Sequence, residues 1–336
     1  MLLSTSSFNR RGQRYWLATG VTAVVLAVVL VAAAERYWRS QGHLPSVIDS
    51  AQLWSLHRSR ANADEALVFL GASRTQFGIH LPTVQQQLPK VTPVMLAANG
   101  RYPLAALKHL AEDGNFNGTV LLDVDARGMA LYNRWAQQEY TDYYTLRWSP
   151  NWHLHRQLLN SWQQQMAVAR PTLGIVPTIT RRLGELPAPH RSYTVLESNR
   201  TGTIDFNRVN VNDLANHFAV GLENDLTNNP PPSPEQWLAE LAPAAQWAKT
   251  IAARGGKVIF YEPPVSGRQR SMADAAYPRE DYWQRFIDHY QLTGLNYQDE
   301  PALLAFDFPD ESHVSGDRRP AYTRALIKIL QRRGLL

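Results

Sequence analysis

The chain has 336 residues, 44% of them hydrophobic and 10% aromatic, enough for one large domain or two smaller ones. It contains no cysteine, which excludes disulfides, thiolate catalysis and cysteine-ligated metals. Of the formal net charge of +5, residues 1–40 carry +4, from five arginines and one glutamate, which leaves +1 for the rest of the chain. A nucleic-acid-binding protein needs a concentrated basic surface, so no nucleic-acid partner is expected.

Residues 16–34, WLATGVTAVVLAVVLVAAA, are uncharged and long enough to cross a bilayer as a helix. Three arginines precede this segment, which favours a cytoplasmic N-terminus for residues 1–15, although two more arginines follow it. Aromatic residues stand at both ends, as is typical of a membrane interface. We therefore expect a single-pass anchor in the inner (cytoplasmic) membrane, with the rest of the chain in the periplasm.

A cleaved signal peptide is the competing interpretation of this segment. The run Ala32-Ala33-Ala34 resembles a small-residue cleavage site. The apolar segment is longer than a usual signal sequence, which favours the uncleaved anchor. Both interpretations export everything after residue 40.

Residues 35–65 are expected to form a polar, helical stalk. A strand–helix alternation follows in residues 66–129. The predicted elements are strands at 66–71, 92–99 and 118–125, and helices at 78–89 and 103–113. Short apolar strands separated by helices are typical of a parallel sheet covered on both faces, so we predict a three-layer α/β/α sandwich.

Residues 130–233 interrupt this alternation and are rich in Trp and Tyr. We predict a mainly helical insertion here, with helices around 151–168 and 210–221. The alternation resumes in residues 234–336. The predicted elements there are helices at 234–256, 279–294 and 316–334, and strands at 257–264 and 302–309.

Serine, histidine and aspartate side chains follow the first and last predicted strands. Ser73 comes directly after the first strand, and Asp310 and His313 follow the last. Ligands of open parallel sheets bind beyond the carboxyl ends of the strands. A serine becomes a nucleophile when an imidazole takes its proton, and a carboxylate three residues away can orient that imidazole. At a helix N-terminus, Ser73 could also offer its own N–H to an oxyanion.

These residues resemble the SGNH (GDSL-like) hydrolase superfamily, whose nucleophile follows the first strand and whose Asp-x-x-His block precedes the C-terminal helix. The resemblance implies that Ser73 is the nucleophile and that Asp310 and His313 complete the triad. It extends more loosely over residues 66–125 and 234–334.

One branch of this superfamily, membrane-anchored and extracytoplasmic, works beside polysaccharide and cell-wall acylation systems. The blocks LGASRT with Gly78, NGRYP from Asn99, and YEPPVSG at 261–267 look like those of this branch.

The chain departs from the family pattern in two places. Ala72 replaces the aspartate of the first block, and LLDVDARG stands where a Gly-x-Asn-Asp block is expected. The family's oxyanion hole uses a glycine N–H and that asparagine. The resemblance therefore implies Gly100 for the first role and leaves Asn99 as the candidate for the second. Arg74 could bind an anionic group of the substrate or pair with a carboxylate, and the second role is favoured.

Other polar and aromatic groups invite functional interpretations. Asp123 and Asp125 lie on a predicted strand and are expected to diverge rather than share a metal. His153 and His155 are also expected to diverge. Seven aromatic residues could stack on sugars or contact a membrane, although core packing is the more common role: Tyr132, Trp135, Tyr140, Tyr143, Tyr144, Trp148 and Trp152.

The sequence thus predicts an anchored periplasmic enzyme that moves an acyl group, with acetyl as the expected one, on or off an envelope or secreted polysaccharide. Neither a metal nor a cofactor is expected. The resemblance suggests an integral-membrane acyltransferase as the partner. The alternative is a non-catalytic assembly subunit of a polysaccharide secretion or modification complex.

Overall fold

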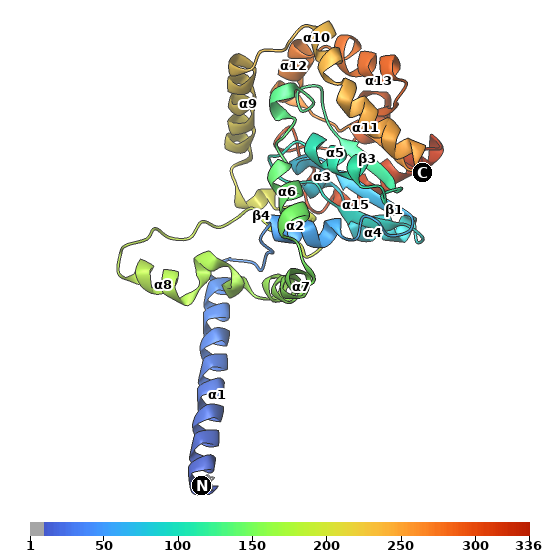
Figure 1. The fold of residues 1–336 in the computed structure, drawn as a ribbon. Helices are drawn as coiled ribbons and strands as arrows, with labels where there is room; N and C mark the ends of the chain where they lie inside the picture. Colours follow the sequence, from blue (N-terminus) through green and yellow to red (C-terminus); the bar gives the residue numbers. More distant parts are fainter. Residues whose placement is uncertain (1–9) are drawn as a thin grey trace, which may run out of the picture. The chain divides into compact units, whose positions relative to one another are not determined.

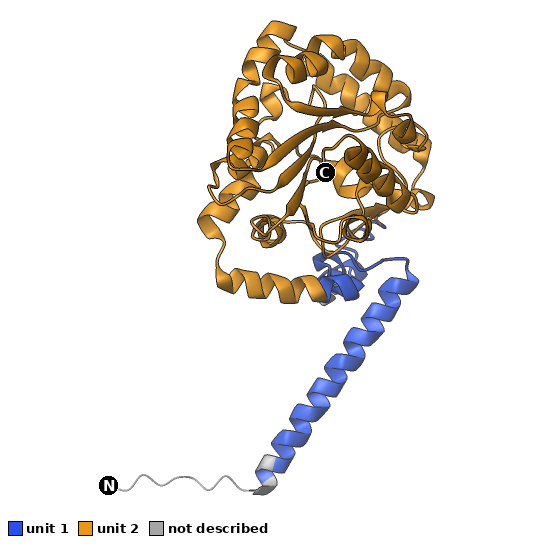
Figure 2. Ribbon diagram, turned by 90° about the vertical axis from the view of Figure 1, so that its right-hand side faces the viewer, with its two compact units in different colours: residues 1–46, 162–191 blue, residues 47–161, 192–336 orange. Residues whose placement is uncertain are grey.

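The computed structural model describes residues 10–336, which divide into two compact units (Figure 2). The described part of the first unit contains residues 10–46 and 162–191, and the second contains residues 47–161 and 192–336. Most of the predicted cytoplasmic segment, residues 1–9, lies outside the described residues.

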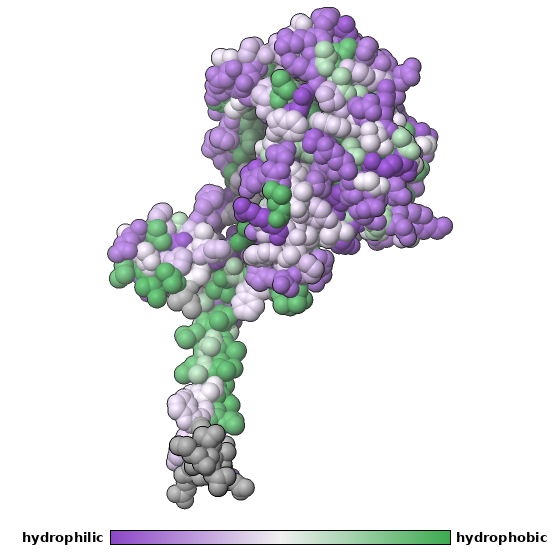
Figure 3. Space-filling view, in the orientation of Figure 1, coloured by the Kyte–Doolittle hydropathy of each residue, from purple (hydrophilic) through white to green (hydrophobic). Residues whose placement is uncertain are grey.

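The first unit is built on helix α1 (Arg10–Ser40). Its segment Arg14–Ser40 is long and apolar enough to span a membrane, and hydrophobic side chains cover its exposed surface (Figure 3). The rest of the unit consists of short helices, which are η2 (Ala167–Ala169), η3 (Pro171–Leu173) and α8 (Ile175–Arg182).

The C-terminal end of α1 is bound to these short helices within the first unit. The Glu35 carboxylate accepts hydrogen bonds from the backbone N–H groups of Ala167 (3.0 Å) and Val168 (2.9 Å). Trp38 packs with Ala167 and Leu173 in a small buried cluster. Residues 167–173 are therefore folded onto the end of the apolar helix.

The second unit contains a five-stranded sheet in the order β2-β1-β3-β6-β7, in which every neighbouring pair is parallel (Figure 1). The strands are β1 (Ala66–Leu70), β2 (Thr92–Met95), β3 (Thr119–Asp123), β6 (Lys257–Glu262) and β7 (Thr293–Asn296). β1 is apolar throughout, and β3 and β6 are apolar between their polar end residues, as expected for a sheet that is buried on both faces.

Alternate residues of the strands point into two separate cores. Val68, Val120 and Val258 are in register across β1, β3 and β6 and belong to one core. Leu67 and Phe69 belong to the other. The first core is completed by α5 (Leu104–Glu112), α10 (Pro234–Glu240) and α11 (Ala242–Ala253), and the second by α4 (Leu81–Gln87) and α15 (Arg319–Arg332). The predicted three-layer α/β/α sandwich is confirmed.

The predicted strand at 302–309 is wrong. Its first residues belong to α14 (Pro301–Leu304), and the last strand is β7, which the prediction assigned to the end of a helix. That helix, α13 (Arg285–Tyr290), ends because Gln291 adopts a left-handed conformation with φ 54°. Gly294 then lets β7 approach α13 closely, since a Cβ there would lie 2.9 Å from the Ile287 side chain.

The stalk prediction is also wrong for the residues that follow α1. Helix α2 (Ala51–Arg58) is largely buried in the second unit. Trp54 is fully buried, and its indole N–H donates to the Leu96 carbonyl at 3.0 Å. Two of the seven aromatic residues singled out above, Tyr140 and Tyr144, pack around Trp54 and so take the core role.

Several predicted helices are divided in the structure. The segment 234–256 is two helices, α10 and α11, and 279–294 begins with a π-helix, Glu280–Gln284. The helix predicted at 78–89 starts only at Leu81, and a separate short helix, α3 (Ser73–Gly78), precedes it. Helix α12 (Gly267–Ala276) was not predicted.

The insertion is mainly helical, as predicted, and contains one unpredicted hairpin. Its longer helices are α6 (Gln138–Arg147), α7 (Pro150–Gln165) and α9 (Val211–Asn228), and its hairpin pairs β4 (Thr194–Leu196) with β5 (Gly202–Ile204). The hairpin lies so close to α3 that a Cβ on Gly202 would be only 2.2 Å from the Phe77 ring.

Candidate active site

Ser73 is the first residue of α3 and follows β1 after a two-residue turn. The turn passes so close to β3 that a Cβ on Gly71 would lie 2.7 Å from Thr75 Oγ1 and 2.8 Å from Asp123 Cβ. Only glycine fits at this position without a shift of its neighbours. The small residues that end β1 therefore bring the Ser73 turn against the end of β3.

The sheet order places this turn at the position where ligands bind in open α/β sheets. Numbered along the sheet strands alone, the order is 2-1-3-4-5, and the chain changes direction between its first and third strands, β1 and β3. The crevice beyond the carboxyl ends of such a pair is the usual binding site. Ser73 follows β1 and Asp125 follows β3.

Asp310 and His313 form a buried pair in the loop before α15. The Nδ1 atom of His313 lies 2.8 Å from Oδ2 of Asp310. The other carboxylate oxygen, Oδ1, accepts the backbone N–H groups of His313 (2.7 Å) and Ser312 (3.1 Å). All three interactions hold the imidazole and the carboxylate in one fixed arrangement, as the spacing of three residues predicts.

The backbone of this loop is strained at one position. Glu311 has a φ of +69°, a conformation that non-glycine residues rarely adopt and that is often found at functional sites. Helix α12 supports it, since the Gln269 side chain donates to the Asp310 carbonyl (2.8 Å) and its backbone N–H donates to the Glu311 carboxylate (2.9 Å). Gly267, with φ +56°, is required because any Cβ there would overlap the Glu311 side chain.

Ser73 and His313 line the same pocket, a cavity of about 350 Å³. Ser73 is partly exposed, whereas His313 is 6% exposed and lies against the rings of Phe77 and Phe218. The Nε2 atom of His313 is buried and has no hydrogen-bond partner among the described residues. The structure thus brings Ser73 and His313 to one cavity, with the buried Asp310 behind the imidazole and without a hydrogen bond between Ser73 and His313.

The two predicted oxyanion residues are placed differently. Gly100 lines the pocket and has a φ of +71°, which glycine adopts without strain. The Asn99 side chain is exposed and does not line the pocket, and its backbone N–H is taken by the Gln76 side chain at 2.8 Å. Of the two, only Gly100 is positioned to contact a substrate.

Gln137 is a supporting residue that the sequence did not reveal. Its side chain is fully buried, and its Nε2 donates to the carbonyls of Gly71 and Arg101, both at 3.0 Å. It thereby joins the Ser73 turn to the loop that carries Gly100. A single glutamine at the start of an insertion gives no pattern from which this role could be predicted.

Arg74 is paired with two carboxylates. Its Nη2 lies 2.8 Å from Asp125 and 3.6 Å from Asp123, so the expectation that these aspartates diverge is wrong. The reason is that residues two positions apart in an extended strand point to the same face, and the backbone still pairs with β6 at Val124, whose N–H donates to the Tyr261 carbonyl.

The surroundings of Asp123 and Asp125 shift the pKa values of both carboxyl groups. Burial raises the pKa of Asp123 despite the nearby Arg74. At Asp125, burial acts in the same direction, but Arg74 and Arg127 outweigh it and lower the pKa. Arg74 therefore compensates buried carboxylates at the floor of the pocket.

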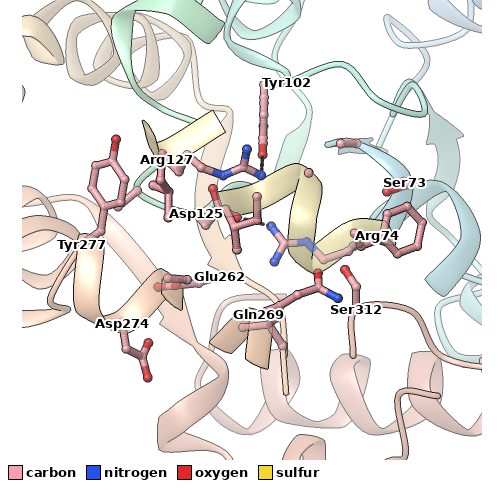
Figure 4. Close-up of a pocket in the computed structure, with 18 of the residues that line it drawn as sticks. Ser73, Arg74, Tyr102, Asp125, Arg127, Glu262, Gln269, Asp274, Tyr277 and Ser312 are labelled. Carbon is pink, nitrogen blue, oxygen red and sulfur yellow. Dashed lines mark hydrogen bonds and ion pairs between the residues drawn. The ribbon is translucent and has the colours of Figure 1, made fainter. Parts of the chain in front are cut away.

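Glu262, at the end of β6, lines the same pocket on the side away from Ser73 (Figure 4). The sequence did not reveal this residue either. Burial, followed by the nearby Asp125 charge, raises its pKa to about 8. Its Oε2 accepts a hydrogen bond from Asn296 at 2.8 Å. At neutral pH this carboxyl group is mainly protonated and can donate as well as accept a hydrogen bond.

Within the described part of the chain, no group of three or more metal-ligating His, Asp or Glu side chains is found. His153 and His155 contact different aromatic rings, those of Trp148 and Trp152. The chemistry that the cavity offers is that of a serine, an imidazole and several carboxyl groups.

Comparisons with known proteins assign the chain to no family. No family model matches the chain, and no curated protein matches it. Among solved structures the chain is similar to one described as the crystal structure of TesA, with 10% identity over 81% of this chain and 99% of that chain, at a TM-score of 0.34. So distant a likeness carries no argument about activity, and the site is interpreted from its own geometry.

Proposed function

We propose that the chain is a membrane-anchored SGNH-like enzyme that moves an acyl group, with acetyl as the expected one, on or off an envelope or secreted polysaccharide. One observation above all supports this proposal. Ser73 and His313 line one cavity, and the ring nitrogen of His313 that does not contact Asp310 is unpartnered within residues 10–336.

The proposed reaction has two steps. Nε2 of His313 takes the Ser73 proton while Oγ attacks the ester carbonyl, and the same proton then goes to the leaving alkoxide, which gives an acyl-serine. In the second step a sugar hydroxyl or water loses its proton to Nε2 and attacks the acyl carbon, and the released Ser73 oxygen takes that proton back from Nε2. A sugar hydroxyl gives transfer, and water gives hydrolysis. The missing Ser73–His313 hydrogen bond is compatible with this scheme, because such bonds often tighten only when substrate binds.

The proposed location rests on the apolar helix α1, and the proposed partner rests on the sequence resemblance. An anchored domain would work on a polymer at the outer surface of the inner membrane, in the periplasm. An integral-membrane acyltransferase would supply the acyl group across the bilayer. These points are supported by the length and composition of α1 and by the sequence resemblance.

A non-catalytic assembly subunit is the second candidate. It is favoured by the position of Asn99, because a site with one oxyanion donor fewer is expected to be slower by about 10²- to 10³-fold. The buried Asp310–His313 pair, in which both carboxylate oxygens of Asp310 are hydrogen-bonded, argues against it.

The test is hydrolysis of p-nitrophenyl acetate by the full chain in detergent micelles. Ser73→Ala should abolish turnover, whereas Ser161→Ala, which changes an exposed hydroxyl on α7, serves as the matched control. No turnover by the wild-type protein, together with a normal cellular phenotype for Ser73→Ala, would support the assembly subunit instead.

A further inference from the structure

The pocket has a second, polar end away from Ser73. Figure 4 shows Ser73 and Ser312 on one side and Tyr277 and Asp274 on the other, with Arg74 and Asp125 between them. We use the name polar end for five residues that line this side of the cavity, which are Glu262, Asp274, Tyr277, Arg279 and Trp283.

Three buried polar atoms of the polar end lack a partner within the part of the chain that the structure describes. They are Tyr277 Oη, Trp283 Nε1 and Arg279 Nε. Tyr277 is 6% exposed and Trp283 is 3% exposed, so these groups are withdrawn from bulk solvent. Nearly all buried polar groups in proteins are hydrogen-bonded, and leaving a donor unpaired is costly. The side chains that carry these atoms line the cavity, and a ligand that accepts and donates hydrogen bonds suits such a wall.

The arginines of the pocket are already neutralised. Arg127 pairs with Asp225 at 2.6 Å, and Arg279 is bound by both oxygens of Asp299 at 2.7 and 2.8 Å. Arg74 is held by Asp125. No cation lining the described pocket is left without a carboxylate, so an anionic ligand would gain little there.

The polar end also contains hydrogen-bond acceptors. Asp274 contributes a carboxylate, and the partly exposed Glu262 can both donate and accept. The mixture of N–H donors, hydroxyl and carboxyl groups beside aromatic rings matches the hydroxyl groups and apolar faces of a sugar.

We propose that the polar end binds a neutral, hydroxyl-bearing sugar ring of the polysaccharide and discriminates against sugars that carry a carboxylate. This inference rests on the proposed function, since it names the substrate class of the same site. A sugar carboxylate would find no arginine lining the described cavity that is not already paired with a carboxylate. An apolar acyl chain would leave the N–H groups of Trp283 and Arg279 unpaired.

The first test is binding of unacylated oligosaccharides to the full chain in detergent, measured by isothermal titration calorimetry. The probes are neutral gluco-, xylo- and manno-oligosaccharides and oligouronates of the same length. At least one neutral probe should bind about tenfold more tightly than every oligouronate. Equal or tighter binding of an oligouronate, or no binding of any neutral probe, overturns the inference.

The second test changes single hydrogen-bonding groups of the polar end. Trp283→Phe and Tyr277→Phe keep an aromatic ring and each remove one unpaired group, so each should weaken neutral-sugar binding about three- to tenfold. Trp162→Phe, at a 51% exposed tryptophan on α7, is the matched control. If neither polar-end variant weakens binding, the sugar occupies another surface and the inference is wrong.

The two proposals fail in different ways. Binding needs no catalysis, so a protein that binds neutral sugars but does not hydrolyse p-nitrophenyl acetate would contradict acyl transfer alone. A protein that hydrolyses this ester through Ser73 but prefers oligouronates would contradict the sugar preference alone.

Discussion

Asp310 binds His313 through its Oδ2 atom, 2.8 Å from the imidazole Nδ1, and leaves the opposite ring nitrogen unpartnered in the described chain. A carboxylate at Nδ1 selects the tautomer in which the proton lies on Nδ1 and the lone pair lies on Nε2. The imidazole is therefore oriented to accept a proton from within the cavity that Ser73 lines.

The first prediction concerns this tautomer. Asp310→Asn should keep the backbone hydrogen bonds to Oδ1 but place an N–H₂ group opposite Nδ1, which moves the ring proton to Nε2 and removes the base. We expect kcat for p-nitrophenyl acetate to fall by about 10³- to 10⁴-fold with the fold retained, as judged by circular dichroism. An activity within tenfold of the wild type would show that His313 is not the base.

The second prediction concerns Gln137, a positioning residue. Gln137→Leu leaves the carbonyls of Gly71 and Arg101 without this donor, and the turn that carries Ser73 should shift relative to Gly100. We expect kcat to fall about tenfold to a hundredfold with a smaller change in KM, and labelling of Ser73 by a fluorophosphonate to slow in parallel. The control is Gln138→Leu, where the exposed side chain bonds only to Asp142.

The third prediction is a pH dependence that originates at Glu262. Its pKa of about 8 in the folded protein lies above the ordinary value of 4.5, so the folded state binds the proton more tightly than the unfolded state does. The resulting stability is fully present below about pH 4.5 and is lost as the pH rises through 8. Its size is on the order of 2–4 kcal/mol, reduced by the partial exposure of the carboxyl.

Glu262→Gln should remove this loss, because the amide cannot ionise. The variant should therefore denature at a higher urea concentration than the wild type at pH 9, with little difference at pH 5. The measurement is urea denaturation at the two pH values. A wild-type and variant difference that does not depend on pH would contradict the raised pKa.

The fourth prediction concerns Arg74. Arg74→Met leaves the buried carboxylates of Asp123 and Asp125 without their cation and should lower the free energy of unfolding by about 3–5 kcal/mol. Arg318→Met, at a side chain that is 70% exposed, is the control and should change it by less than about 1 kcal/mol. If Arg74 instead served only to bind an anionic substrate, Arg74→Met would weaken substrate binding and leave stability unchanged.

The sandwich could be predicted from the sequence because β1, β3 and β6 are continuous apolar runs bounded by turns. The exception was β7, whose residues TGLN have no apolar pattern and become a strand only because Gln291 ends the preceding helix. The buried position of α2 could not be predicted either, since its polar residues resemble those of an exposed helix until Trp54 is seen to fill the core.

The placement of Ser73 on the cavity could be predicted from its position directly after β1. His313 also reaches the cavity, but from the loop before α15, because the strand predicted at 302–309 does not form. The other lining groups could not be predicted in this way. Tyr277 and Trp283 follow β6 with no motif between them, and Gln137 acts through two carbonyls that only the folded chain brings together. Such contacts depend on loop conformations, which sequence periodicity does not determine.

The attachment of Glu35 and Trp38 to residues 167–173 determines where a water-soluble form can be cut. Truncation at residue 41 removes both side chains and exposes the N–H groups of Ala167 and Val168, whereas truncation after Ala34 keeps them. The backbone N–H groups of Ala167 and Val168 should therefore exchange slowly with deuterium in the longer form and rapidly in the shorter form. The last turns of the apolar helix are then part of the folded protein and have to be retained in any soluble version of it.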